Sequence, residues 1–231
     1  MVEGAVHTVA MASPEDVSKV AELFDSGRVA PADVIAIIAQ TEGDGYARGY
    51  SALALQNLFS ERLNVSRKQI FEQIPMLMIG GTAGMMCPHF TLFVNKPSSA
   101  RGNPGIKRMV LAAANTRALL PEEYGRMAEV EEVAKTVKAT MKTAGITDPV
   151  DVHSVQLKVP SMTAVRMNDA ARRGQSVCDP NPVVASGKTR GAAALGTAVW
   201  PTSTTGSLDA ILVCIRKKDA PRRAASKLAC V

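Results

Sequence analysis

The stretch that decides the fold is Gly27–Val34, GRVAPADV, because its pattern returns in Gly145–Val152, GITDPVDV. Both read G-x-x-x-P-x-D-V, and they lie 118 residues apart. A second pair follows in the same order, Arg48–Leu53 (RGYSAL) and Arg190–Leu195 (RGAAAL), at an offset of 142, so the second copy carries 24 extra residues between its matches. Two ordered matches indicate an internal repeat.

The two copies share local signals. A helical pattern precedes each glycine, from Ser13 in the first copy and from Leu120 in the second, and glycine suits a helix end. A short apolar strand is expected after each motif, at Val34–Ala39 and at Val152–Leu157. A helix start is expected after each Arg-Gly pair, and Ser66 is expected to cap a further helix. Further strands are expected at Pro75–Ile79, Phe90–Val94 and Lys107–Ala112.

This alternation predicts an α/β fold of tandem pseudo-symmetric units, each a mixed β-sheet covered by helices, around a central pocket. We expect residues 1–105 to form the first unit and residues 106–231 the second. The second unit is expected to be incomplete at its C-terminal end, because nothing there matches Phe90–Val94.

Composition narrows the class of protein. The 231 residues are 46% apolar and 21% charged, as in ordinary globular proteins. No apolar run is long enough to span a membrane, and the first residues lack a secretory pattern. Four widely separated cysteines and three histidines form no ligand cluster, so we expect a cytoplasmic protein with reduced thiols and with neither metal nor cofactor.

The positive charge is concentrated at the end of the chain. Residues 216–231 hold six lysines and arginines against one acid, within a net charge of +6. A basic segment can bind nucleic acid or an acidic membrane surface. Because it lacks interleaved aromatic residues, we favour a solvated tail and expect neither partner.

Three features could carry chemistry. Lys158 ends an apolar strand, opposite Gln40 of the first copy, and is either a base or a lysine that snorkels at a strand edge. Arg48 and Arg190 are repeated cations, which either grip ligand oxygens or form ion pairs with the repeated acids Asp33 and Asp151.

The third feature is the glycine-rich turn Ile79–Gly84. Its backbone N–H groups could hold a carbonyl oxygen or an oxyanion, although a tight turn that needs positive φ is the simpler explanation of the glycines. The turn has neither Walker nor dinucleotide spacing. Cys87 and His89 are too close in sequence to form a catalytic pair, and we interpret them as incidental.

These residues resemble the ring-opening cyclic amide hydrolases, the cyanuric acid amidohydrolases and barbiturases. The likeness runs from about residue 10 to residue 198, over the first two of the family's three repeats. The motifs are QTEGDG (40–45), YARGY (46–50), MIGGTAG (78–84), Pro88-His89, LPEE (120–123), VQLK (155–158) and TRGAAALG (189–196).

The resemblance implies three related α/β units around a pseudo-threefold axis, with a central pocket for a flat ring of alternating N–H and C=O groups. It assigns ring-carbonyl contacts to Arg48 and Arg190. It also places the backbone of Gly80 and Gly81 against the ring. It makes Lys158 the base that deprotonates a serine, which attacks a ring carbonyl. The resemblance places this serine beyond residue 215, and Ser226 is the nearest serine at about the expected distance after Arg190.

The chain also departs from the family pattern. Gln40 replaces the lysine of the first repeat, Ile79 replaces its serine, and the third repeat is absent. We therefore expect a cyclic amide hydrolase homologue that opens a cyanuric-acid- or barbiturate-like ring by Ser-Lys chemistry, impaired in this chain. The alternative is a catalytically degenerate binding or interaction protein on the same scaffold. An open third side predicts a homo-oligomer.

Overall fold

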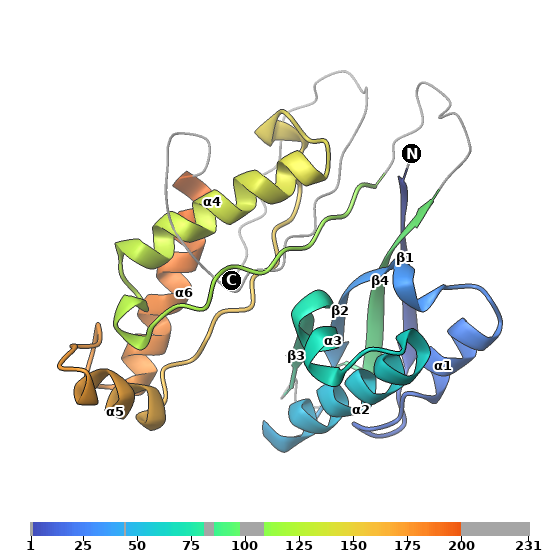
Figure 1. Cartoon of the computed structure of the whole chain (residues 1–231), viewed down its shortest axis with the longest axis horizontal. Helices are drawn as coiled ribbons and strands as arrows, with labels where there is room; N and C mark the ends of the chain where they lie inside the picture. Colours follow the sequence, from blue (N-terminus) through green and yellow to red (C-terminus); the bar gives the residue numbers. More distant parts are fainter. Residues whose placement is uncertain (1, 44, 81–85, 98–108, 200–231) are drawn as a thin grey trace.

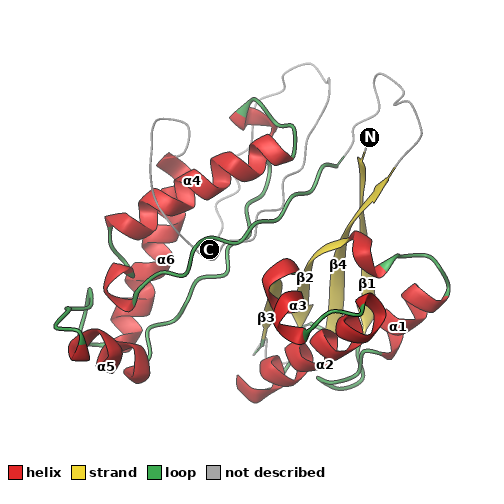
Figure 2. Cartoon of the chain, viewed as in Figure 1, coloured by secondary structure: helices red, strands yellow, loops and turns green. Residues whose placement is uncertain are grey.

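The computed structural model of the chain describes residues 2–43, 45–80, 86–97 and 109–199. Two bodies lie side by side in Figure 1, and extended segments run between them. The first body holds a sheet with helices, and the second body is built from helices, as the colouring by secondary structure in Figure 2 shows. The chain is thus a mixed α/β protein, as the sequence predicts.

The first unit is a four-stranded mixed sheet with the order β1-β4-β2-β3. Strands β2 and β3 are parallel, whereas β4 runs antiparallel to β1 and to β2. Its elements are β1 (Val2–Ala10), α1 (Ser18–Asp25), β2 (Val34–Gln40), α2 (Gly45–Leu63), α3 (Arg67–Gln73), β3 (Met76–Ile79) and β4 (His89–Pro97). The expected strands at Val34, Pro75 and Phe90 are confirmed, as is the Ser66 cap, whose hydroxyl accepts a hydrogen bond from the Gln69 N–H.

The hydrophobic core of this unit lies between one face of the sheet and its three helices. Phe24 of α1 and Phe59 of α2 meet edge to face, with ring centroids 5.2 Å apart, above the buried strand residues Ile37 and Leu92. The other face of the sheet is covered by the chain around Leu111, whose carbonyl accepts a hydrogen bond from Asn95 Nδ2 at 3.0 Å. The start of the second unit therefore packs on the back of the first sheet.

The second unit has its own core, between α4 (Met127–Thr143) and α6 (Pro182–Val199), with α5 (Ala164–Arg172) beside them. The two long helices approach closely because Gly196 has no side chain. A Cβ there would lie 2.4 Å from Cβ of Val133. Among the described helices none is both long and apolar enough to cross a membrane.

The repeated G-x-x-x-P-x-D-V motif has the same backbone conformation in both units. Gly27 and Gly145 end their helices with φ of +67° and +68°, a region that favours glycine. Each is followed by a single 3₁₀ turn, η1 (Pro31–Asp33) and η3 (Pro149–Asp151). The repeat inferred from sequence is thus present in the local structure, and α5 lies within the interval where the second copy is longer.

The helices expected to start after each Arg-Gly pair begin before it, α2 at Gly45 and α6 at Pro182. Three other local predictions are wrong. The helix expected from Ser13 begins at Ser18, because the Asp16 carboxylate accepts hydrogen bonds from the N–H groups of Ala12 and Ser18 and holds a turn there. The helix expected from Leu120 is a separate turn, η2 (Pro121–Glu123), followed by a break at Gly125, where φ is +68°. The Glu123 carboxylate caps that turn by accepting the N–H of Leu120 at 2.7 Å.

The third concerns strands of the second unit. Residues 152–157 are extended but contain only a single bridge residue, Leu157, and residues 109–112 form no regular strand. A strand needs a ladder partner. The counterpart of β4 would fall after residue 199, outside the described residues. The proposed unit boundary at residue 105 also lies outside them and stays a proposal.

Candidate functional site

The parallel strands β2 and β3 end side by side, and we call this end of the first sheet its carboxyl edge. Gln40 and Ile79 are register partners there, and Gln40 is also paired with His89 of β4. Gln40 is almost fully buried, whereas Ile79 is 46% exposed. The two positions that carry lysine and serine in the resembled family are therefore adjacent in this chain.

Thr41 fixes the start of the glycine-rich turn. Its N–H and its hydroxyl both donate to the Ile79 carbonyl, at 2.8 and 3.0 Å, and its side chain is buried. The carbonyl at the end of β3 is thereby satisfied within the protein. The backbone that leads into Gly80 is therefore held in place by Thr41. Gly81 lies outside the described residues.

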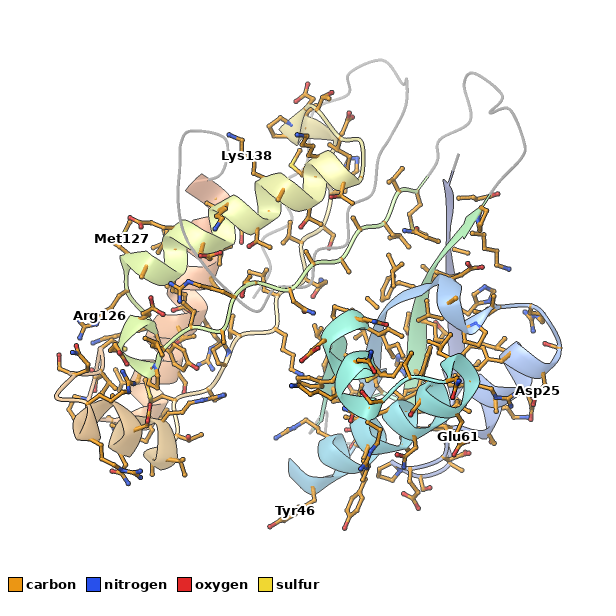
Figure 3. All side chains as sticks on the ribbon, viewed as in Figure 1. Asp25, Tyr46, Glu61, Arg126, Met127 and Lys138 are labelled. Carbon is orange, nitrogen blue, oxygen red and sulfur yellow. The ribbon has the colours of Figure 1, made fainter. Side chains whose placement is uncertain are left out.

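Arg48 lies against this turn. It is in the first turn of α2, and a Cβ added to Gly80 would lie 3.3 Å from one terminal guanidinium nitrogen of Arg48. The glycine therefore leaves room for the guanidinium group. Among the described residues no ion pair joins Arg48 to Asp33 or Arg190 to Asp151, so the alternative of paired structural salt bridges is not realised there. Figure 3 shows Tyr46 at the end of α2, pointing away from the ribbon.

Lys158 makes contacts with the first unit. Its Nζ donates to the Met76 carbonyl at 2.9 Å, and it lies 5.8 Å from the ring centroid of Phe71. A cavity of about 500 Å³ opens beside it, lined by residues of both units. Its lining includes Phe71, Met76, Asn115, Lys158 and Arg166.

The positions of Met76 and Gly80 give the distance along β3 between the contact of Lys158 and that of Arg48. Met76 begins β3 and Gly80 follows its end, so four residues at about 3.3 Å each separate the contact of Lys158 from that of Arg48, or roughly 13 Å. The structure brings together Arg48, Ile79 and Gly80, and it places Lys158 at the opposite end of β3.

Arg190 lies on the exposed side of α6, next to the fully buried Thr189. The convergence of its guanidinium group with that of Arg48 stays a prediction. Ser226 lies outside the described residues, so its pairing with Lys158 is likewise a prediction. Within the described ranges no three His, Cys, Asp or Glu side chains gather into a group that could hold a metal ion.

Sequence reasoning missed two residues near Lys158. Phe71 follows the core residue Ile70, and adjacent helix positions point about 100° apart, so a phenylalanine there is a candidate for a contact outside that core. Arg166 stacks over the Tyr124 ring at 5.6 Å and donates to the Ser161 carbonyl. Nothing in its local sequence indicates that it lines a cavity with Lys158.

A third missed residue is Glu129 of α4, which is fully buried. Glu129 lies four residues before the buried Val133, on the same apolar face of the helix. An acidic residue on an apolar helix face is the sequence signal that indicates it. One carboxylate oxygen accepts the N–H of Gly125, while the other is buried with no hydrogen-bond partner among the described residues. Burial raises the pKa of Glu129 to about 7.

Comparison with known proteins gives consistent matches. A family model described as amidohydrolase ring-opening protein matches residues 5–210. The chain is 43% identical over 206 residues to a cyanuric acid amidohydrolase of Enterobacter cloacae, and 39% identical over 198 residues to a cyclic amide hydrolase of Azorhizobium caulinodans. These matches cover 85% and 84% of this chain but 55% and 54% of the relatives.

A barbiturase 2 of a Nocardioides species is 37% identical over 198 residues, which cover 84% of this chain and 53% of that protein. The chain thus spans about half the length of the curated relatives it matches.

Two solved structures are also similar. One is a cyanuric acid hydrolase described as an evolutionary innovation by structural concatenation. It matches with a TM-score of 0.85 at 32% identity, over 94% of this chain and 68% of that one. The other is the cyanuric acid hydrolase of A. caulinodans, with a TM-score of 0.78 at 37% identity, over 87% of this chain and 55% of that one.

Proposed function

The chain belongs to the ring-opening amidohydrolase family, and from that premise we propose that it binds a planar cyclic amide and hydrolyses one of its C–N bonds. Proteins named cyanuric acid amidohydrolase, cyclic amide hydrolase and barbiturase are 37–43% identical to it over 198–206 residues. We propose a ring of the cyanuric acid or barbiturate class as the substrate.

The observation that carries the proposal is the position of the Arg48 side chain against Gly80, at the carboxyl ends of β2 and β3 in the first sheet. A guanidinium group donates hydrogen bonds in one plane, which suits a ring carbonyl oxygen. The exposed alkyl group of Ile79 beside it offers an apolar contact for a flat ring. We assign Arg48, Ile79 and Gly80 to ring binding, with Gly81 as the next backbone donor and Arg190 as the corresponding cation of the second unit.

For the chemistry we propose Lys158 as general base and a serine as nucleophile, with Ser226 as the candidate. In this proposal the serine and the ring together span the roughly 13 Å along β3 between the contact of Lys158 and that of Arg48. The amine takes the hydroxyl proton while the serine oxygen bonds to a ring carbonyl carbon. Backbone N–H groups stabilise the oxyanion. When the tetrahedral intermediate collapses, the ring C–N bond breaks and the nitrogen takes the proton from the ammonium group. Water, deprotonated by Lys158, then bonds to the acyl carbon, the ester C–O bond breaks, and the serine oxygen takes the proton back from the ammonium group.

We propose that the two units have different roles, the first in ring binding and the second in catalysis. At the carboxyl edge of the first unit the paired positions hold Gln40 and Ile79, and neither an amide nor an alkyl group can accept a proton from a nucleophile. This unit therefore binds, and the second unit supplies the base. The same pair favours the second candidate function, a binding protein that retains the ring pocket without turnover.

We also propose that the protein self-associates and that it is cytoplasmic. Tyr46, Tyr50 and Leu53 expose an apolar stripe on α2, and Leu195, at the repeated position of Leu53, is exposed on α6. Contiguous exposed apolar surface favours association. The free thiols of Cys87 and Cys178 support a reducing compartment.

The test is an assay of ring opening with cyanuric acid and with barbituric acid, paired with calorimetric titration of both rings. Loss of the ring accompanied by product supports hydrolysis, and its abolition in Lys158→Ala supports the assigned base. Binding without product selects the binding-protein alternative. Neither binding nor product with either ring contradicts both.

A further inference from the structure

Lys158 of the second unit is in contact with two residues of the first unit, Phe71 and Met76. The first unit therefore has a role besides the one that Gln40 and Ile79 indicate. Phe71 of α3 is 56% exposed, which is unusual for a phenylalanine on a short helix that buries Ile70. Its ring centroid lies 5.8 Å from Lys158 Nζ, within the range of a cation–π interaction. The exposed ring is therefore in contact with a group of the other unit.

A second contact fixes the same amine. Lys158 Nζ donates to the Met76 carbonyl at 2.9 Å, and Met76 lies at the start of β3, five residues after Phe71. A carbonyl on one side and a ring face on the other restrict a flexible four-carbon side chain to few rotamers. Both contacts come from the corner between α3 and β3, and both reach a residue 82 or more positions away.

We infer that Phe71 is a positioning residue for Lys158, and that the first unit thereby holds and stabilises the base of the second. This rests on the proposed function, in which Lys158 takes a proton from the nucleophile. At that moment the amine becomes an ammonium ion, and the negative face of the ring stabilises it. The carbonyl of Met76 accepts from the same group and keeps its direction fixed.

Other charged groups lie near the amine. Arg166 of α5 and Glu72 of α3 line the same cavity of about 500 Å³. The Glu72 carboxylate lies 3.9 Å from Lys68 Nζ, and both side chains are well exposed. Arg166 is directed to the Tyr124 ring and the Ser161 carbonyl. A substitution at Phe71 therefore removes the contact between its ring and Lys158 and leaves the charged groups around the amine in place.

The test compares Phe71→Leu with Phe71→Tyr, which keeps the ring, and with Met127→Ala, which removes an exposed apolar side chain of α4. We expect Phe71→Leu to lower kcat about three- to tenfold with KM nearly unchanged, since cation–π contacts have that magnitude. Phe71→Tyr is expected to keep the wild-type kcat, and Met127→Ala to leave it unchanged.

A second readout does not need turnover. The ε-methylene resonance of Lys158, assigned by its loss in Lys158→Arg, is followed by NMR as the pH rises. With the ring removed, the ammonium form loses stabilisation, so its titration is expected to move to lower pH in Phe71→Leu but not in Phe71→Tyr.

The two readouts separate the failure of this inference from the failure of the proposed function. If the chain opens neither ring but the Lys158 titration moves in Phe71→Leu, the positioning contact stands and the proposed function falls. If the titration is the same in Phe71→Leu and wild type, the inference is overturned, whatever the activity.

Discussion

Gln40 and Ile79 are register partners at the carboxyl ends of β2 and β3. Parallel strands present their ends at the same edge, so this arrangement brings two positions 39 residues apart in sequence next to each other. With a glutamine and an isoleucine there, the edge offers a binding surface and no base. We predict that Ile79→Ser, at a 46% exposed position, folds normally and gains no turnover of its own. Ring opening that survives Lys158→Ala in the Ile79→Ser background would contradict this.

A second prediction concerns the room that Gly80 leaves for Arg48. A Cβ at Gly80 would lie 3.3 Å from a guanidinium nitrogen, so Gly80→Ala is expected to displace that group and weaken ring binding about fivefold with little change in stability. Calorimetric titration measures this. Gly49→Ala is the control, because a Cβ there meets nothing within 4 Å. Equal affinity in Gly80→Ala and wild type would remove Gly80 from the site.

The contact between α4 and α6 gives a third prediction. In Gly196→Ala the new Cβ would lie 2.4 Å from Val133 Cβ and 2.5 Å from the Val130 carbonyl oxygen, so the helices must separate. We expect the free energy of unfolding to fall by about 1–3 kcal/mol, as measured in urea. Gly191→Ala lies on the same helix with nothing within 4 Å, and is expected to be neutral or stabilising. Equal stability of the two variants would show that α4 and α6 are not in contact at Gly196.

The fourth prediction follows from the buried Glu129. Its pKa is about 7 in the folded protein against an ordinary value of 4.5, so the folded state binds this proton more tightly than the unfolded state. The stabilisation is complete below about pH 4.5 and is lost as the pH rises through 7. We expect the difference in unfolding free energy between Glu129→Gln and wild type to grow in favour of the variant from pH 5 to pH 8. A difference that does not change with pH would refute the raised pKa.

Much of the fold could be predicted from the sequence because the repeated motif has a local physical basis. Gly27 and Gly145 occupy a conformation that other residues avoid, and the proline that follows each of them begins a 3₁₀ turn. The pattern therefore specifies the backbone in both units. Strand β1 was missed because Gly4 and His7 interrupt its apolar alternation, although it pairs along its whole length with β4.

The site was predictable only where its residues lie within one motif or one strand pair. Arg48 and Gly80 belong to two of the motifs that mark the family resemblance, and the Arg48 side chain lies against Gly80. The neighbours of Lys158 come from elements that are distant in sequence and carry no motif, so only packing reveals Phe71 and Arg166 beside it. Helix α5 and the 3₁₀ turn at Glu123 depend on tertiary hydrogen bonds, including Arg173 Nη2 to Glu122 at 2.7 Å, which a local pattern cannot specify.

The measurement that tests the central claim most directly is the rate of ring opening by Lys158→Ala and by wild type, with cyanuric acid and with barbituric acid. A positioned general base contributes about a hundredfold or more, so we predict that the variant loses turnover by at least that factor while its fold and its ring binding through Arg48 persist. Undiminished turnover in Lys158→Ala would contradict the assignment of Lys158 as the base and the mechanism built on it.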